Sequence, residues 1–410
     1  MDYKETKRGP VVQVQLRHPT HLPVYKKVHN FSHHPKDGPP MVLLSGGSGA
    51  RTLSEILVRY THNSTHLLPM FDDGGSSCEC RKAFNMAPPG DLRNRLMSIS
   101  DMTRSGNPEV SRLFRSRLSR DATPGVLQRE LDSYLWEGHP QMARIEPRYR
   151  RIIIKHLERF NAAKPEDFDL RGGSIGNFVM VGSYLNLGDL ESVVFEFSAL
   201  AAVRGEVLPV CAGGNLHLMA ELENGDTWIG QSRITSQHHP PIRRMAIVTR
   251  DEDGSHEEVR PQLNALAERA IRKTALVAYT MGSFYTSLVS NIMVQGMGRV
   301  IRETKRPKVF VANLTRSEET GGMSVSTMLG ELLRYLRGSD DDPGQMKDYV
   351  HYVLVGTHGD SDEGGRLPVD LPAIRELGVE PIELPLERRS EDGRLLHDPE
   401  MVAAVLISLC

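Results

Sequence analysis

Short apolar runs recur along the chain, and each is followed by a glycine-rich or polar loop and then by a segment with helical spacing. Runs of this kind are typical of strands that are buried on both faces of a parallel sheet. The runs that we predict to be strands cover residues 41–44, 65–71, 276–279, 309–312 and 350–355. Their alternation with helices predicts an α/β fold with a Rossmann-like, doubly wound and mainly parallel sheet.

Two regions depart from this alternation. From about residue 105 to about residue 170 the chain has little strand pattern, many arginines and apolar residues at helical intervals, which predicts a helical insertion. Residues 1–40 are basic and rich in histidine and proline, and only the alternation at 12–16 indicates a strand, which would pair at a sheet edge. We therefore predict an N-terminal extension over 1–40 and a Rossmann-type domain over 41–410 that carries the insertion.

A glycine-rich turn follows the first predicted strand. It contains Gly46, Gly47, Ser48 and Gly49 and precedes a helix predicted for 51–60. Glycines let backbone N–H groups approach an anion, and a helix N-terminus favours negative charge, so this turn is a candidate phosphate-binding loop. It lacks the lysine of a P-loop and the third glycine of a dinucleotide fingerprint. A structural strand-to-helix turn is the alternative.

The second predicted strand ends in two adjacent acids, Asp72 and Asp73. Mg²⁺ prefers one or two carboxylates together with phosphate oxygens and water, so we expect these acids to hold Mg²⁺ or to deprotonate an acceptor hydroxyl. The alternative is an Asx-type turn with solvated acids. The residues that follow them are further candidates for ligand binding: Gly74, Gly75, Ser76 and Ser77.

A third loop, at 88–91, leads into a predicted helix at 92–98. Asp91 is placed to cap this helix, and Arg93 and Asn94 fall in its first turn. An arginine in that position opposes the helix dipole, which favours an anion nearby. We expect Arg93 to stabilise charge on a leaving phosphate and Asp91 and Asn94 to contact the ligand. The alternative is that Arg93 pairs with Asp91 or Asp73.

A second phosphate-binding candidate lies towards the C-terminus. After the predicted strand at 276–279, Gly282 and Ser283 open a helix whose first N–H groups would face the same crevice. The hydroxyls of Ser283 and Thr286 would bond a diphosphate, and Tyr285 would either stack on a base or pack internally. Asn313 directly follows the next predicted strand and is a further candidate for ligand binding.

Composition and charge narrow the function classes. The chain has 410 residues, 39% of them hydrophobic, and a formal net charge of −2, which gives no footprint for nucleic acid or an acidic membrane. Because no apolar run is long enough to span a bilayer and no signal peptide is apparent, we expect a cytoplasmic protein. Four cysteines are too few for a disulfide framework. We interpret Cys78 and Cys80 as reduced thiols in a loop, with a metal or redox role as the alternative.

The loop motifs, taken in order, resemble those of the CofD-like superfamily, and the similarity extends over 41–410. The resemblance is closest to the YvcK-like branch and to the CofD-related proteins of the GAK system. The motifs are Gly-Gly-Ser-Gly at 46–49, Asp-Asp-Gly-Gly-Ser-Ser at 72–77, Pro-Pro-Gly-Asp-Leu-Arg-Asn-Arg at 88–95, Gly-Gly-Asn-Leu-His-Leu at 213–218, Met-Gly-Ser-Phe-Tyr-Thr-Ser at 281–287 and Val-Ala-Asn-Leu-Thr-Arg-Ser-Glu-Glu-Thr-Gly at 311–321.

This resemblance implies a Rossmann-like domain and a ligand that contains a nucleoside diphosphate, and it places Asn177 beside that ligand. From the residues alone, Asn177 would either donate to a phosphate or base edge or serve in helix capping. In the founding enzyme of the superfamily, the activity is Mg²⁺-dependent transfer of a phospholactyl-type group to a deazaflavin alcohol. The YvcK-like proteins instead bind a UDP-sugar and act in central metabolism and cell-wall homeostasis. Residues 78–81 and 280–283 depart from the YvcK pattern, which indicates a different sugar or acyl group.

We therefore predict a Mg²⁺-dependent transferase, similar to 2-phospho-L-lactate transferase, that moves a phospho-acyl-type group from a nucleoside diphosphate donor to an acceptor hydroxyl. The alternative is a non-catalytic UDP-sugar-binding regulator, and a third hypothesis is an NAD-dependent oxidoreductase. The superfamily motifs do not decide among these activities. A homo-oligomer is compatible with these features, which do not determine the oligomeric state.

Overall fold

The computed structural model describes residues 20–47, 49–136, 138–236, 238–250, 254–340, 344–357 and 365–410. The strand that we predict at 12–16 and the candidate ligand residue Ser48 lie outside the described residues.

The described residues form a seven-stranded sheet in which every neighbouring pair of strands is parallel. Its order is β11-β10-β9-β8-β1-β2-β3. The strands are β1 (Met41–Leu44), β2 (Ser64–Leu68), β3 (Glu206–Pro209), β8 (Leu276–Tyr279), β9 (Lys308–Val311), β10 (Tyr352–Gly356) and β11 (Glu380–Leu384). The predicted α/β, doubly wound parallel fold is therefore confirmed.

The strand order creates a switch point beside β1. From β1 the chain moves outward through β2 and β3, and it then returns to β8 on the other side of β1. Leu44, the last residue of β1, pairs with Tyr279, the last residue of β8. In sheets of this kind, ligands bind outside the carboxyl ends of the strands where the order reverses.

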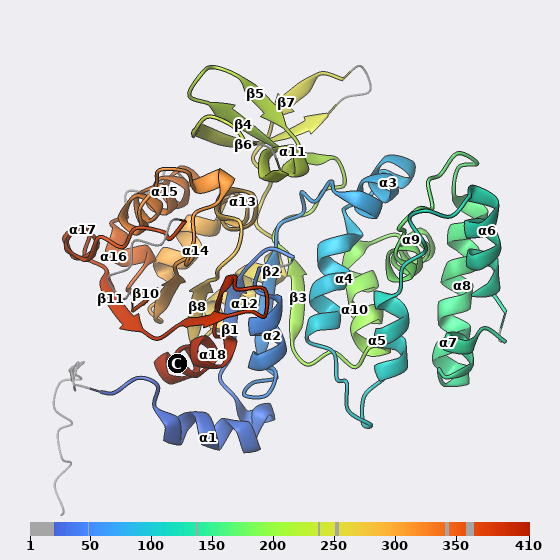
Figure 1. Cartoon of the computed structure of the whole chain (residues 1–410), viewed down its shortest axis with the longest axis horizontal. Coiled ribbons are helices and arrows are strands. Elements are labelled where there is room, and N and C mark those ends of the chain that lie inside the picture. The colour runs from blue at the N-terminus through green and yellow to red at the C-terminus, as the bar shows by residue number, and fades with distance from the viewer. Residues whose placement is uncertain are drawn as a thin grey trace, which may run out of the picture.

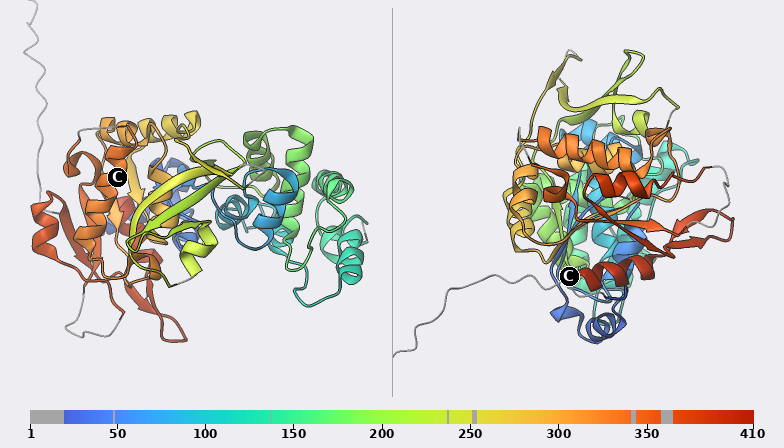
Figure 2. Two further views of the ribbon diagram at one scale, coloured as in Figure 1. Left: turned by 90° about the horizontal axis from the view of Figure 1, so that it is seen from above. Right: turned by 90° about the vertical axis from the view of Figure 1, so that its left-hand side faces the viewer.

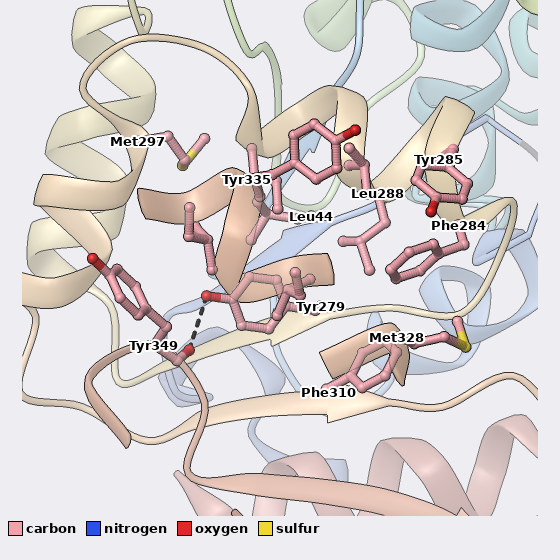
Figure 3. Close-up of a cluster of buried hydrophobic side chains, with 14 of the residues drawn as sticks. Leu44, Tyr279, Phe284, Tyr285, Leu288, Met297, Phe310, Met328, Tyr335 and Tyr349 are labelled. Carbon is pink, nitrogen blue, oxygen red and sulfur yellow. Dashed lines mark hydrogen bonds between the residues drawn. The ribbon is translucent and has the colours of Figure 1, made fainter. Parts of the chain in front are cut away.

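Helices cover both faces of the sheet (Figures 1 and 2). They bury the apolar side chains of its strands in two cores. Figure 3 shows one face, where Leu44, Tyr279 and Phe310 project into a core covered by helices. There the Tyr279 hydroxyl donates to the carbonyl of Tyr349 at 2.9 Å. The helices with side chains in this core include α12 (Ala265–Lys273), α14 (Met297–Glu303), α15 (Val325–Gly338), α16 (Met346–Tyr349) and α17 (Leu371–Glu376). The opposite face is covered by α2 (Arg51–Leu57) and α18 (Pro399–Leu409).

A helical layer lies beyond the β3 edge of the sheet, between β2 and β3 in the sequence (Figure 1). It has its own apolar core, in which the rings of Phe160 and Phe178 stack at 4.4 Å. The layer consists of α3 (Gly75–Phe84), α4 (Pro89–Ser98), α5 (Pro108–Arg115), α6 (Pro124–Ser133), α7 (Pro140–Ala143), α8 (Pro147–Ala163), α9 (Ile175–Leu187) and α10 (Leu190–Leu200). The segment predicted as a helical insertion supplies α5 to α8.

The prediction that Asp91 caps the third-loop helix is wrong. Helix α4 begins two residues earlier, at Pro89, and Asp91 lies within its first turn without making a capping hydrogen bond. Proline is well suited to the first helical position because its φ is already helical and the N–H it lacks would have no partner there.

A small antiparallel sheet of four described strands lies above the switch point in Figure 1, in the order β5-β4-β6-β7. Its strands are β4 (Leu216–Leu222), β5 (Thr227–Ile229), β6 (Ile242–Arg250) and β7 (His256–Glu258). In the sequence, apolar runs at 216–222 and 227–234 flank an Asn-Gly pair at 224–225, which predicts a hairpin, and this hairpin is present between β4 and β5. Its second strand ends at Ile229 and does not continue to residue 234, because Gly230 turns the chain with φ 103° into α11 (Gln231–Ser236).

The remaining elements join these layers. A hairpin of β12 (Glu387–Arg389) and β13 (Leu395–His397) precedes α18. In the described part of the N-terminal extension, α1 (Tyr25–His33) lies beside α18, and the Val24 N–H donates to Ser408 Oγ at 2.8 Å. The following η1 (Pro35–Asp37) contacts the segment before β2, where the His62 N–H donates to the carbonyl of Pro35 at 2.8 Å. The short segments after β8 and β9 are η2 (Phe284–Val289), α13 (Ser290–Ile292) and η3 (Glu318–Thr320). None of the helices in the described ranges has the length and apolar character needed to cross a bilayer.

Candidate functional site

The loops singled out in the sequence meet at the carboxyl ends of β1, β2 and β8. The backbones of two of these loops touch at Gly49 and Gly282, because a Cβ added to Gly49 would lie 2.6 Å from the Gly282 Cα. Only glycine permits this approach at position 49. A cavity of about 300 Å³ opens here and is lined by residues after β1, β8 and β9 and by the β12–β13 hairpin. This volume is at the lower end of the range for ligand pockets.

Asn313 fixes the conformation of the β8 loop. Its side-chain amide accepts the N–H of Gly282 at 3.2 Å and donates to the Gly282 carbonyl at 2.8 Å. Gly282 has a φ of 144°, which is accessible to glycine but costly for other residues. Asn313 lines the cavity, as its position after β9 predicts. Its side-chain amide binds the backbone of the β8 loop at Gly282.

Arg95 anchors the glycine-rich loop from below, and sequence reasoning gave it no role. This fully buried guanidinium donates to the carbonyls of Gly46 at 2.6 Å and Ala50 at 3.0 Å, and to Ser54 Oγ. Arg95 thus holds the glycine-rich loop at two residues, one on each side of the turn. One feature of the sequence indicates that Arg95 is buried. It lies in a predicted helix close to Leu92 and Leu96, both of which are buried in the structure.

Asp91 meets the same loop from α4. Its carboxylate accepts the N–H of Gly47, and a Cβ at Gly47 would lie 1.7 Å from Asp91 Oδ1. Burial, followed by repulsion from Asp72, raises the pKa of Asp91 to about 7, and Arg95 and Arg93 act in the opposite direction. The glycine at position 47 is thus required by an internal carboxylate.

Asp72 and Asp73 point to different partners. Asp72 Oδ1 accepts the N–H of Gly74 at 3.0 Å, which is an Asx-type turn, while Oδ2 lies 2.7 Å from a Cβ built on Gly90. Asp73 Oδ1 accepts the N–H of Ser232 in α11 at 2.7 Å. The charge of Asp72 repels that of Asp91, while Asp73 joins the β2 loop to α11.

Two serines at the start of α3 connect the loops. Ser77 Oγ accepts the N–H of Gly90 at 3.1 Å, and Ser76 Oγ accepts a hydrogen bond from Asn177 Nδ2 at 3.0 Å. Asn177 is 1% exposed, and its Oδ1 has no hydrogen-bond partner among the described residues. Gly75 begins the helix with a φ of 48°. The structure therefore brings Asn177 and the N-terminus of α3 together.

Arg93 is buried beneath the start of α9. It donates to Ser174 Oγ, to the carbonyl of Phe114 at 3.4 Å and to Asn94 Oδ1 at 2.8 Å. Burial and then Arg117 lower the pKa of Arg93 to about 10, and Asp72 and Asp91 act in the opposite direction. Arg93 thus donates its hydrogen bonds to neutral groups. It interacts with the charges of Asp72 and Asp91 only through space.

The second predicted phosphate loop already binds an internal carboxylate. Glu319, which is 5% exposed, accepts the N–H groups of Tyr285 at 2.7 Å and Thr286 at 3.1 Å and the Thr286 hydroxyl at 2.5 Å. Tyr285 packs internally and its hydroxyl donates to Glu331 at 3.3 Å. Of this loop, Gly282 and Ser283 line the cavity.

The cysteines lie on helix α3 and not in a loop, which corrects that part of their interpretation. Cys80 is buried, and burial raises the pKa of its thiol to about 12. Within the part of the chain that the structure describes, no group of three or more His, Cys, Asp and Glu side chains is arranged to hold a metal. A Mg²⁺ ion held by two carboxylates and ligand oxygens does not require such a group.

Comparisons with known proteins agree with this architecture. A family model described as 2-phospho-L-lactate transferase CofD matches residues 41–386. The gluconeogenesis factor of Bacillus subtilis is 25% identical over 385 residues, which cover 90% of this chain and 98% of that protein. A putative gluconeogenesis factor of Thermotoga maritima is 27% identical over 371 residues, covering 89% of this chain and 91% of the relative.

A solved structure shows the same fold. It is a member of the UPF0052 family from Bacillus halodurans, with a TM-score of 0.65 and 23% identity over 90% of this chain and 99% of that one. The family model covers the switch point, the three loops of the first half and the strands of the main sheet. The chain described here belongs to the CofD family.

Proposed function

We propose that this protein binds a compound containing a nucleoside diphosphate at the switch point and, with Mg²⁺, transfers a phospho-acyl-type group from it to an acceptor hydroxyl. The observation that carries the proposal is the position of two half-buried carboxylates, Asp72 against Gly90 and the next residue, Asp91, against Gly47 of the glycine-rich loop. Two carboxylates that repel each other in a partly desolvated place form a favourable environment for a divalent cation.

The donor set fits Mg²⁺. Asp72 Oδ2 and the Asp91 carboxylate would supply hard oxygen ligands, and phosphate oxygens and water would fill the remaining positions. When bound, Mg²⁺ would neutralise charge on the phosphates of the donor. Asp73 is directed to α11 and is not a member of this set.

The chain's own residues would position the donor. The N-terminus of α3, at Gly75 and Ser76, presents backbone N–H groups and the positive end of the helix dipole to an anion. Arg93 and Arg95 add positive charge from buried, hydrogen-bonded positions that need no rearrangement. Fixed charges of this kind stabilise a leaving phosphate more effectively than mobile ones.

A non-catalytic nucleotide-sugar-binding regulator is the second candidate. It is favoured by the names of the relatives, which are called gluconeogenesis factors and match about nine-tenths of this chain. Ligand holding and group transfer require the same loops, so binding alone does not separate the two candidates. Release of a nucleoside monophosphate from the donor would occur only in the transferase.

The test is a titration of GDP and of a UDP-sugar by calorimetry at increasing Mg²⁺, with wild type, Asp72→Asn and the adjacent Asp73→Asn as the matched control. We expect Mg²⁺ to strengthen binding to wild type and to Asp73→Asn, and to have at least about tenfold less effect on Asp72→Asn, because one ligand of the ion has lost its charge.

Parallel Mg²⁺ curves for wild type and Asp72→Asn would refute the metal role. Mass spectrometry of the compound that co-purifies with the protein then identifies the activity. A guanosine ester converted to GMP supports the transferase, an unchanged UDP-sugar supports the regulator, and a nicotinamide dinucleotide supports the third hypothesis.

A further inference from the structure

A second cavity lies at the amino ends of the main-sheet strands, opposite the switch point. Its volume is about 420 Å³, which is within the range of small-molecule pockets. Its floor includes Val42 of β1, Thr65 of β2 and Leu208 of β3, each of which is at most 9% exposed. This cavity shares no lining residue with the cavity at the switch point. The two are separate because each lies at a different end of β1.

One face of helix α12 forms the wall of this second cavity. The residues of this face are spaced three or four positions apart, so they lie on the same side of the helix. They are Leu266, Arg269, Ala270 and Lys273. A different face of α12, with Ala267 and Ile271, is buried in the main core. The helix therefore presents two cations to the cavity while its apolar face packs elsewhere.

These two cations have no counter-charge within the protein. Arg269 and Lys273 are exposed, and neither forms an ion pair with a carboxylate in the described ranges. Arg272, on the third face of α12, pairs instead with Glu268 and with Glu303, each at 2.8 Å. The helix dipole favours Lys273 in the last turn, but Arg269 lies before that turn. Since like charges four residues apart repel each other on a helix, an anion between them would stabilise both.

The other titratable groups of the cavity do not neutralise this charge. Glu206 is the carboxylate among the lining residues, and it accepts a hydrogen bond from Thr65 Oγ1 at 3.0 Å without pairing with either cation. Burial, followed by the charge of Arg204, lowers the pKa of His62, so this lining side chain is neutral at pH 7. The cavity thus combines an apolar floor with an excess of positive charge on one wall.

We propose that this cavity binds a small phosphate monoester, with its phosphate between Arg269 and Lys273 and a compact apolar body on the floor at Val42 and Leu208. A phosphate monoester carries close to two negative charges at pH 7, which match two cations, whereas a carboxylate carries one. Arginine binds phosphate through its planar fork and lysine as a point charge. This site is additional to the nucleotide site proposed above and does not depend on it.

The experiment uses phenyl phosphate as the probe, because it combines a phosphate monoester with one apolar ring. The methyl resonances of Val42, Leu266 and Ala270 are followed in labelled wild-type protein as the probe is added. We expect saturable shifts with a Kd of about 10 mM or below, as is usual for so small a ligand. Benzoate, with the same ring and one negative charge, should bind at least about threefold more weakly.

Three substitutions test whether the charges of the cavity carry the binding. Lys273→Gln should weaken the affinity for phenyl phosphate at least about threefold, because it removes a charge-assisted hydrogen bond. Glu206→Gln should strengthen it about twofold, because it removes a repulsive charge and keeps an acceptor for Thr65. Arg272→Gln removes the same charge from another face of α12 and is the matched control, with an affinity that should stay within about twofold of wild type.

Several results would overturn the proposal. They are unshifted Leu266 and Ala270 resonances, equal affinities for benzoate and phenyl phosphate, equal effects of Lys273→Gln and Arg272→Gln, and an unchanged affinity in Glu206→Gln. The first two comparisons use wild type alone, so they do not depend on the folding of a variant. Because the two cavities have no lining residue in common, each of these results would leave the nucleotide site at the switch point untouched.

Discussion

Glu319 holds Thr286 by both its backbone N–H, at 3.1 Å, and its hydroxyl, at 2.5 Å. The same carboxylate accepts a hydrogen bond from Thr235 in α11 at 3.2 Å. It thereby joins the β8 loop, the β9 loop and the small sheet. The sequence predicts that Thr286 donates to a phosphate, whereas in the folded chain its N–H and hydroxyl donate to the buried Glu319 carboxylate.

Replacing Glu319 by alanine should lower the free energy of unfolding by at least about 2 kcal/mol, because two buried N–H groups lose their acceptor. Chemical denaturation monitored by circular dichroism measures the change. Glu318→Ala is the matched control, since Glu318 is 51% exposed and pairs with a His238 side chain that is 90% exposed. We expect less than about 1 kcal/mol for it. An equal decrease in unfolding free energy in the two variants would contradict the stabilising role of Glu319.

The raised pKa of Asp91 predicts a pH dependence of stability. The unfolded chain releases this proton near its ordinary pKa of about 4, whereas the folded chain releases it near 7. Between these values the folded state binds more protons, so the contribution of Asp91 to stability decreases as the pH rises from about 4 to about 7. The decrease is at most about 4 kcal/mol, since one pKa unit corresponds to about 1.4 kcal/mol.

Asp91→Asn removes this titration and keeps an oxygen that accepts the N–H of Gly47. The difference in unfolding free energy between pH 5 and pH 8 should therefore be smaller in the variant than in wild type. Denaturant midpoints at a series of pH values provide the measurement. Identical pH profiles for the two proteins would show that Asp91 is already ionised at pH 5.

Gly47→Ala should destabilise the protein, because the new Cβ would lie 1.7 Å from Asp91 Oδ1. We expect a loss of about 1–3 kcal/mol, the usual range for overpacking a buried position. Gly330→Ala is the control, since this helical glycine of α15 has open space around it and alanine should stabilise it by about 0.5–1 kcal/mol. If Gly47→Ala is as stable as wild type in thermal unfolding, Asp91 does not occupy that space.

Arg95→Met tests the anchor of the glycine-rich loop. It leaves the carbonyls of Gly46 and Ala50 without a charged donor, so we expect a loss of about 2–3 kcal/mol in urea unfolding. Arg51→Met changes an exposed arginine on neighbouring α2 whose partner is Glu55 four residues away, and its effect should stay below about 0.5 kcal/mol. A small effect at Arg95 would mean that the loop keeps its shape without the guanidinium.

The sequence predicts the strands of the main sheet where the apolar pattern is local. The boundaries of β1 and β8 match the apolar runs at 41–44 and 276–279 because each strand is buried on both faces and ends at a glycine or polar loop. The sequence does not predict the short helix α11, because the apolar residues Trp228, Ile229 and Ile234 are typical of a continued strand. In the structure the chain turns at Gly230, which ends β5 and lets α11 begin.

The sequence also predicts that the candidate loops lie at one edge of the sheet, since parallel strands end on the same side. It does not predict which backbone and hydroxyl donors of these loops form hydrogen bonds to other residues of the chain. The contacts of Asp91 with Gly47 and of Glu319 with Thr286 join segments that are distant in sequence, and no local pattern encodes them. Asp72 and Asp73 are adjacent, yet their different directions depend on α11, which is about 160 residues away.

The pairing of β1 with β8 also has a consequence for biosynthesis. The two strands that border the switch point are separated by more than half of the chain, from Leu44 to Leu276. During translation, the glycine-rich loop is therefore made long before the strand that completes the crevice, and a nascent chain has no assembled crevice until β8 has emerged. Long-range parallel pairing of this kind is slow to form, so assembly of the crevice belongs to the last stages of folding.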